Sequence, residues 1–285
     1  MKRLPSSPTR SEPRASGLGR LRATVVVGSV AIVTFVTSSC QSSPSAHPGS
    51  AASAATAHIA EPPHPPLSLQ YLAITTGSAA PDAKLPLVIA LHGLGGRPEN
   101  FLTLFEEFPT RARIVAPHSK TKYGDGFEWF APYGAISDES APALGKAADE
   151  VAVFAEQAAA RFPTLGKPIV TGFSQGGALS FAVAVRHPAS IGASLPISGW
   201  LPPPLWPSDL PKDAPPIIAF HGTADQRVPL ERDQSAVTAL AKLGFHAELQ
   251  VNEGVEHAIP PQVRDQVYAA LTTACDDQRK KGPHP

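Results

Sequence analysis

Short apolar runs that alternate with helical patterns constrain the fold of this chain more than any other feature. Strands are predicted at 67–75, 85–91, 114–117, 167–172, 191–197, 217–220 and 245–251. Helices are predicted at 149–162, 178–186, 231–243 and 263–274. The run LPLVIAL at 85–91 is typical of a strand that is buried on both faces. Because alternating strands and helices require crossover connections, the sequence predicts an α/β fold with a mostly parallel sheet and helices on both faces.

A serine between two glycines stands where the strand at 167–172 passes into the next helix. The segment is Gly172-Phe173-Ser174-Gln175-Gly176. Flanking glycines allow a sharp strand-to-helix turn that lifts a serine above the sheet. Five residues alone do not establish a nucleophile, but their position at a strand end makes Ser174 the candidate. The alternative is a glycine-rich helix start packed against a strand.

Two further strand ends carry an aspartate and a histidine. Asp225 directly follows the buried strand at 217–220, whereas its rivals Asp209, Asp213 and Asp233 do not follow such a strand. His257 follows the strand at 245–251, whereas its rival His246 lies inside that strand. A carboxylate can orient an imidazole, which then takes the proton of the serine. The chain order Ser, Asp, His is that of α/β-hydrolases, so we expect a triad of Ser174, Asp225 and His257.

A glycine-rich loop at 92–96 (HGLGG) follows the strand at 85–91. In this architecture, one oxyanion donor comes from such a loop and the other from the residue after the nucleophile. We therefore expect the oxyanion hole at the backbone N–H groups of Leu94 and Gln175. His92 and His221, which each precede a glycine at a strand end, are expected to shape their loops by hydrogen bonding.

These segments resemble the phospholipase/carboxylesterase family, which includes the acyl-protein thioesterases. The similar stretches are LHGLGG at 91–96, GFSQGG at 172–177, ISGWLP at 197–202, HGTADQRVP at 221–229 and GVEHAI at 254–259, with looser matches at 116–119 (APHS) and 128–130 (EWF). The resemblance covers about 67–275. It implies an α/β-hydrolase fold and a serine triad that cleaves small-molecule or lipid carboxylic esters. In some members the substrates are thioesters or lysophospholipids, and the family uses no metal and no cofactor.

Aromatic residues in the segment 120–140, and Trp200 after the strand at 191–197, are candidates for the wall of an acyl pocket. From this set we expect Trp129 and Trp200 to bind substrate. The alternative is an aromatic loop packed on the edge of the sheet. Two other functions remain open: an extracellular polyester depolymerase or feruloyl-type esterase with the same triad, and a non-catalytic binding lipoprotein built on the hydrolase scaffold.

Residues 1–39 have the organisation of a lipoprotein signal peptide. Basic residues precede an uncharged apolar run at 23–36, which is too short to span a bilayer comfortably. Small residues then precede Cys40, as in the bacterial lipobox, so Cys40 is the candidate lipidation site. Cleavage nearby by another peptidase and an uncleaved membrane anchor are the alternatives. Because Gln41 follows Cys40, the resemblance to lipoprotein signal peptides indicates the outer membrane in a cell that has two membranes. At that location we expect the substrates to be envelope or extracellular esters.

The rest of the sequence indicates the domain limits and the classes of partner to expect. Residues 40–66 are rich in Ala, Ser and Pro, which predicts a flexible tether. The catalytic domain is expected over 67–276 and a disordered tail over 277–285. Cys275, in the last predicted helix, is expected to be a buried structural thiol. Lys plus Arg and Asp plus Glu both total 24, and this balance argues against a nucleic-acid partner.

Overall fold

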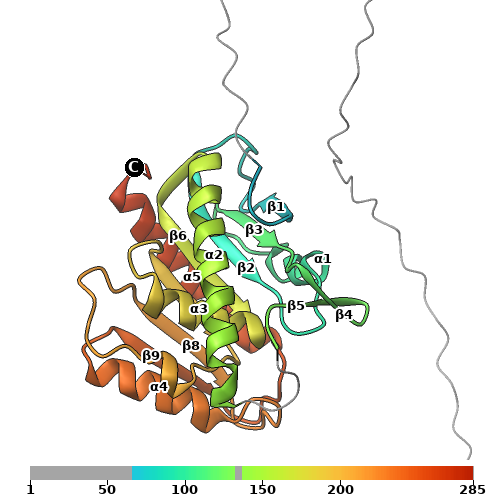
Figure 1. The fold of residues 1–285 in the computed structure, drawn as a ribbon. Helices are drawn as coiled ribbons and strands as arrows, with labels where there is room; N and C mark the ends of the chain where they lie inside the picture. The colour runs from blue at the N-terminus through green and yellow to red at the C-terminus, as the bar shows by residue number, and fades with distance from the viewer. Residues whose placement is uncertain (1–65, 132–136, 285) are drawn as a thin grey trace, which may run out of the picture. The chain divides into compact units, whose positions relative to one another are not determined.

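A seven-stranded sheet forms the centre of this computed structural model, which describes residues 66–131 and 137–284 (Figure 1). Its strand order is β1-β3-β2-β6-β7-β8-β9. The strands are β1 (Tyr71–Thr75), β2 (Leu85–Leu91), β3 (Arg113–Pro117), β6 (Thr164–Phe173), β7 (Ala193–Ile197), β8 (Ile217–Gly222) and β9 (Ala247–Asn252). Strand β1 runs antiparallel to β3, and the other neighbouring pairs are parallel. The predicted α/β architecture with a mostly parallel sheet is confirmed.

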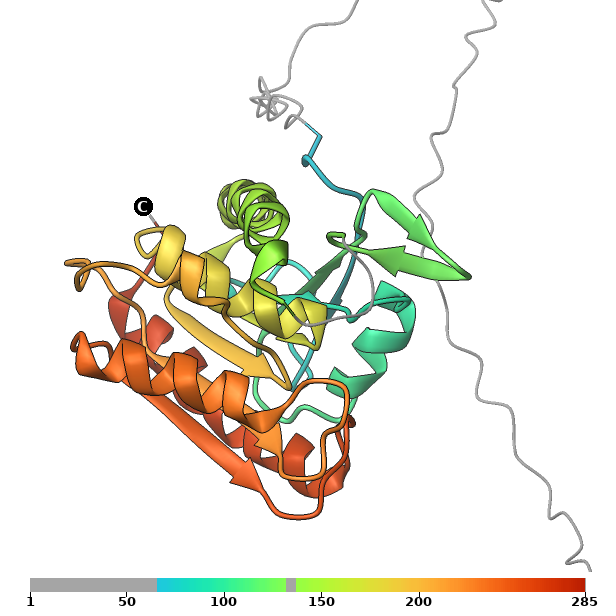
Figure 2. The same ribbon diagram turned by 60° about the horizontal axis from the view of Figure 1, so that its bottom comes forward.

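Helices cover both faces of the sheet. They are α1 (Pro98–Leu102), α2 (Ala141–Arg161), α3 (Gln175–Arg186), α4 (Leu230–Lys242) and α5 (Pro261–Lys281), with short 3-10 helices η1 (Thr103–Phe105), η2 (Asp138–Ser140) and η3 (Pro203–Leu205). In β2, Leu87, Ile89 and Leu91 join an apolar cluster with α2, α3 and α4, whereas Val88 and Ala90 join a second cluster with α1 and α5. Figure 2 shows α3 and α5 on opposite sides of the sheet. The alternation of side chains along a strand thus gives the fold its two buried layers.

The observed elements differ from the predicted ones in several places, two of which lie around the aromatic segment. Helix α2 begins at Ala141, two turns before the predicted start at 149. The prediction missed these turns because they are rich in alanine and carry few large apolar side chains. A hairpin of β4 (Thr121–Tyr123) and β5 (Gly126–Glu128) was not predicted. The hairpin lies in the aromatic segment at 120–140. It is joined to the glycine-rich loop at 92–96, hereafter the donor loop, by the backbone hydrogen bond from Gly95 N–H to Phe127 O, 2.8 Å.

The predicted disordered tail over 277–285 is wrong for residues 277–284. Helix α5 continues to Lys281, and the backbone N–H of His284 donates to Thr164 O at 3.0 Å. Gln278 is buried, and its Oε1 accepts from the backbone N–H of Lys167 at 3.0 Å. The sequence did not predict the burial of Gln278, because its neighbours at 276–281 are all polar or charged. Cys275 is buried as expected, and burial raises the pKa of its thiol to about 12.

The predictions for the signal peptide at 1–39, the tether at 40–66 and the lipidation of Cys40 fall on residues 1–65, outside the described part, apart from residue 66. None of the helices in residues 66–131 and 137–284 has the length and the hydrophobicity that a membrane-spanning segment requires.

Candidate active site

Ser174 stands alone between β6 and α3, because β6 ends at Phe173 and α3 begins at Gln175. Its φ is 58° and its ψ is −115°, a backbone conformation that a residue with a side chain rarely adopts. The backbone N–H of Ser174 donates to Ile197 O at 2.9 Å, which ties the turn to the end of β7. This is the strained strand-to-helix turn that the sequence predicted.

Close packing of backbone against backbone explains the glycines around Ser174. A Cβ atom at Gly176 would lie 2.1 Å from Leu91 O, and one at Gly172 would lie 2.5 Å from Gly176 O. Neither contact can be relieved by a side-chain rotation, because the obstructing atoms belong to the backbone. Glycine therefore allows α3 to begin directly against the end of β2.

The substitution Gly176→Ala is expected to destabilise the protein by at least about 3 kcal/mol, because β2 and α3 must separate to admit the methyl group. The matched control is Gly145→Ala in α2, where an added Cβ would meet only side-chain atoms, at 3.4 Å or more. Alanine is the better helix former, so the control should change stability by no more than about 1 kcal/mol. Urea unfolding measures both free energies. Equal unfolding midpoints for wild type and Gly176→Ala would show that the packing argument is wrong.

Asp225 and His257 are joined directly. His257 Nδ1 lies 2.6 Å from Asp225 Oδ2, and the side chain of Asp225 is fully buried. The other carboxylate oxygen, Oδ1, accepts from the backbone N–H groups of Arg227 and Val228, both at 2.9 Å. The ring of His257 also packs on the ring of Phe173, with centroids 4.6 Å apart. The imidazole is thus oriented by one carboxylate and by the residue that precedes Ser174.

The same contacts keep Asp225 ionised. Burial alone would raise the pKa of this carboxyl group, but the hydrogen bond from His257 and those from the backbone N–H groups of Val228 and Arg227 outweigh burial and lower the pKa below its usual value. A carboxylate that stays charged at neutral pH can fix the tautomer of His257 and stabilise its protonated form.

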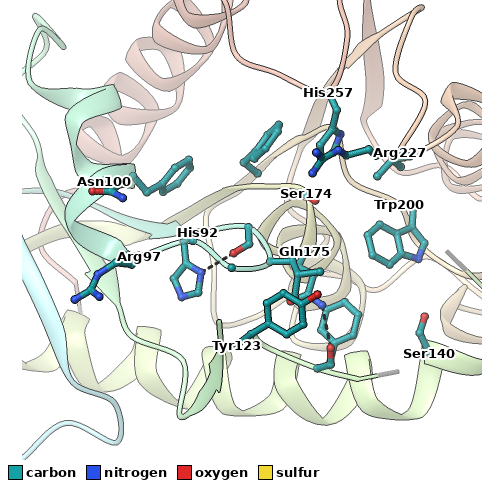
Figure 3. Close-up of a pocket in the computed structure, with 18 of the residues that line it drawn as sticks. His92, Arg97, Asn100, Tyr123, Ser140, Ser174, Gln175, Trp200, Arg227 and His257 are labelled. Atoms are coloured by element: carbon teal, nitrogen blue, oxygen red, sulfur yellow. Dashed lines mark hydrogen bonds between the residues drawn. The ribbon is translucent and has the colours of Figure 1, made fainter. Parts of the chain in front are cut away.

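Ser174 and His257 line one pocket of about 760 Å³ (Figure 3). No hydrogen bond joins the two side chains in the described part of the chain. Both line the cavity together with the donor loop at 92–96. The structure therefore brings together the three residues that the sequence selected from three separate strand ends.

Leu94 and Gln175, the expected oxyanion donors, both line this pocket. Among the described residues, no group accepts a hydrogen bond from either backbone N–H. The loop at 92–96 holds its shape without them, because Gly95 N–H donates to Phe127 O and Gly96 N–H donates to Gly93 O. Both N–H groups are therefore free to donate to a negatively charged oxygen near Ser174.

His92 shapes the donor loop from inside, as expected. Its Nδ1 lies 2.8 Å from Gly93 O, so Nδ1 carries the proton, and its ring stacks on Trp129 with centroids 4.9 Å apart. Only 1% of His92 is exposed. Burial lowers the pKa of His92 to about 4, and the bond to Gly93 offsets this only in part.

This low pKa makes stability depend on pH. Below pH 6.5 the unfolded chain takes up a proton at residue 92, whereas the folded protein does so only near pH 4, so acidification favours unfolding. The cost reaches about 3 kcal/mol at pH 4. Relative to wild type, His92→Asn should therefore gain up to that amount between pH 7 and pH 4, measured by urea unfolding at each pH. A constant difference across this range would contradict the prediction.

His221 fixes the turn that carries Asp225. It is buried, its Nε2 donates to Val228 O at 2.9 Å, and its Nδ1 lies 2.8 Å from Asp233 Oδ2. Asp233, which the sequence offered as an alternative to Asp225, thus pairs with His221 and not with His257. Burial raises the pKa of Asp233 to about 6, despite this hydrogen bond. The rival histidine, His246, is exposed beside Glu248, in keeping with its predicted role outside the site.

Of the two expected substrate-binding tryptophans, Trp200 lines the pocket and Trp129 does not. The indole N–H of Trp129 donates to His92 O at 2.8 Å, and its backbone N–H donates to Gln175 Oε1 at 3.0 Å. The prediction of substrate contact is therefore corrected for Trp129, because hydrogen bonding and stacking turn its indole toward the donor loop. Phe130 and Tyr123 from the same segment line the pocket instead.

Several lining residues were missed by the sequence analysis. They are Arg97, Asn100, Phe101, Ser140, Gln226 and Arg227. Most lie in loops or in the short helix α1, where no hydrophobic period indicates which side chains face a cavity. The signal for Gln226 and Arg227 was their position directly after Asp225. Among the described residues, no group of three or more His, Cys, Asp or Glu side chains could hold a metal ion.

Known proteins resemble the chain in sequence and fold. The sequence profile of the phospholipase/carboxylesterase family matches residues 73–274. A probable carboxylesterase of Oryza sativa subsp. japonica is 30% identical over 215 residues, which are 68% of this chain and 80% of the relative. Acyl-protein thioesterase 1 of Eremothecium gossypii is 27% identical over 233 residues, 74% of this chain and 97% of the relative. The crystal structure of esterase PE8 has a TM-score of 0.63 and 25% identity, and covers 72% of this chain and 99% of its own.

The family match begins within β1, ends within α5 and includes all the strand-end loops that line the pocket. The chain therefore belongs to the phospholipase/carboxylesterase family, a group of carboxylic ester hydrolases with the α/β-hydrolase fold.

Proposed function

We propose that the protein is a serine carboxylesterase that works through Ser174, His257 and Asp225 and forms an acyl-enzyme. The observation that carries the proposal is the 2.6 Å bond between His257 Nδ1 and Asp225 Oδ2 in the pocket that Ser174 also lines. This bond leaves Nε2 of His257 as the basic nitrogen for the serine proton. Ester hydrolysis by a serine nucleophile needs such a base beside the serine hydroxyl group.

The reaction proceeds in two halves. Ser174 Oγ attacks the acyl carbonyl carbon while His257 Nε2 takes its proton, and the carbonyl oxygen becomes an oxyanion that accepts from the N–H groups of Leu94 and Gln175. The C–O bond to the alcohol breaks as His257 returns the proton to the leaving oxygen. A water molecule then attacks the acyl-enzyme with His257 as base, which releases the acid and regenerates Ser174.

A fluorophosphonate probe tests the nucleophile. Its phosphorus is attacked by an activated serine oxygen, fluoride leaves, and the enzyme gains the mass of one phosphonyl group. We expect one label per chain, located by mass spectrometry on the peptide that contains Ser174. The variant Ser208→Ala, which changes an exposed serine outside the pocket, should label like wild type. A label on another serine, or no label on folded protein, would overturn the proposal.

The preferred acyl chain is open to a direct measurement. The family name, phospholipase/carboxylesterase, and the related acyl-protein thioesterase leave three substrate classes to compare: carboxylic esters, lysophospholipids and thioesters. Initial rates across p-nitrophenyl esters of increasing chain length, with a lysophospholipid and a thioester alongside, separate them. A polyester and a feruloyl ester added to the panel test the depolymerase and feruloyl esterase alternative. Absence of turnover on every substrate, together with absence of probe labelling, would favour the non-catalytic binding lipoprotein.

We further propose that the protein is exported and anchored to the cell envelope by lipid on Cys40. The proposal is supported by the apolar run at 23–36 and the small residues before Cys40. Wild-type protein should incorporate labelled palmitate and enter the detergent phase on Triton X-114 partition, whereas Cys40→Ser should do neither. Labelling of Cys40→Ser to the wild-type extent would show that the cysteine is not the lipidation site.

A further inference from the structure

The pocket beside Ser174 is lined by basic side chains and, among the described residues, by no acidic one. The basic residues are Arg97, Arg227, His92 and His257. His92 is uncharged near neutral pH, because burial lowers its pKa to about 4. The two guanidinium groups therefore give the described lining a fixed positive charge.

The two arginines differ in their partners. Arg97 Nε lies 3.6 Å from Glu99 Oε2, and Arg97 Nη1 donates to Asp125 O at 3.0 Å. The side chain of Arg227 is exposed and forms neither an ion pair nor a hydrogen bond with any described residue. Among the described residues, the guanidinium group of Arg227 therefore has no partner and can bind an anion in the pocket, whereas the charge of Arg97 is already offset by Glu99.

Backbone contacts place Arg227 close to the reacting groups. Its N–H donates to Asp225 Oδ1, and Asp225 Oδ2 accepts from His257. Figure 3 shows the side chains of Arg227 and His257 together above Ser174. The carboxylate of Asp225 forms no ion pair with this guanidinium group, because the carboxylate is fully buried and its oxygens accept hydrogen bonds from the backbone N–H groups of Arg227 and Val228 and from His257.

We propose that Arg227 determines specificity by binding a carboxylate or phosphate group on the substrate, so that the enzyme prefers esters with an anionic group near the scissile bond. The inference rests on the proposed esterase function and names the substrate class of the same site. A guanidinium group pairs with such oxyanions through two parallel N–H donors. Phe130 and Trp200 add apolar surface to the same pocket, which weakens the screening of a bound anion by water.

Two matched substrate pairs test the inference and distinguish the position of the anion. The acyl pair is mono-p-nitrophenyl glutarate against p-nitrophenyl valerate. The alcohol pair is 4-butyryloxyphenylacetate against 4-butyryloxyphenylacetamide, whose phenol leaving groups are alike because a methylene group insulates the charge. For each pair, the measured quantity is the ratio of kcat/KM for the anionic ester to kcat/KM for the neutral ester. Wild type, Arg227→Gln, Arg227→Lys and Lys212→Gln are compared.

We expect wild type to favour the anionic ester in at least one pair and Arg227→Gln to lower that ratio by about fivefold. Arg227→Lys should retain part of the preference, and about 1 M salt should weaken it in wild type. Lys212→Gln removes one positive charge outside the pocket and should keep the wild-type ratio. Substitution of the side chain leaves the backbone N–H that Asp225 accepts, so the triad stays oriented.

The inference is overturned if Arg227→Gln keeps the wild-type ratio in both pairs, or if wild type shows no preference for either anion. In those outcomes the neutral esters are still hydrolysed and Ser174 still labels, so the proposed function stands. If wild type hydrolyses none of the four esters and the fluorophosphonate probe does not label Ser174, the proposed function is overturned, and the inference with it. If the probe still labels Ser174, only the inference is overturned.

Discussion

Replacing Asp225 by asparagine should lower kcat by about 10⁴-fold at neutral pH while the fold is kept. The reason lies in the different partners of the two carboxylate oxygens. Oδ1 accepts from two backbone N–H groups, those of Arg227 and Val228, and Oδ2 accepts from His257. An asparagine must place its amide oxygen at the Oδ1 position, because an NH₂ group there would oppose two donors.

That orientation turns the NH₂ group of asparagine toward His257. Nδ1 of the imidazole must then accept, which moves the ring proton to Nε2, the nitrogen that should receive the proton of Ser174. The variant therefore holds the right geometry with the wrong tautomer. This outcome differs from a loss of folding, because the two backbone donors to residue 225 remain satisfied.

Steady-state kinetics on p-nitrophenyl butyrate and thermal unfolding measure the two consequences separately. The matched control is Asp209→Asn, which alters an exposed rival aspartate and should keep the wild-type kcat. A kcat for Asp225→Asn within tenfold of wild type would mean that the carboxylate does not set the tautomer, and would remove Asp225 from the mechanism.

The candidate site was predictable because its parts lie at strand ends. Runs such as LPLVIAL at 85–91 and IIAF at 217–220 indicated buried strands, and the carboxyl ends of parallel strands meet at one edge of the sheet. Ser174, Asp225 and His257 could therefore be grouped without any knowledge of distances. The order of these three residues along the chain then indicated the α/β-hydrolase type of fold.

Side-chain direction and tail packing were not predictable in the same way. Trp129 was expected in the pocket, but its indole bonds to His92 O, a contact that depends on how the β4-β5 hairpin meets the donor loop. The last residues of α5 are polar and gave no hydrophobic period, although Gln278 is buried there against β6. Arg227 was part of a matched motif, and only the structure placed its side chain at the pocket.

Ser174→Ala is expected to have the largest effect on activity of any substitution considered. The alanine keeps the backbone N–H that donates to Ile197 O, so the turn between β6 and α3 remains anchored. It removes the only oxygen that can form the acyl-enzyme in the proposed mechanism. Stability should change by no more than about 1 kcal/mol, because one partly exposed hydroxyl group is lost.

The most direct test is therefore kcat/KM on p-nitrophenyl butyrate for wild type and for Ser174→Ala, on protein whose thermal unfolding transition matches that of wild type. The proposed mechanism predicts a loss of about 10⁴-fold or more, since removal of a triad nucleophile leaves only the oxyanion donors and the binding pocket. A folded Ser174→Ala enzyme that hydrolyses the ester within tenfold of the wild-type rate would contradict it.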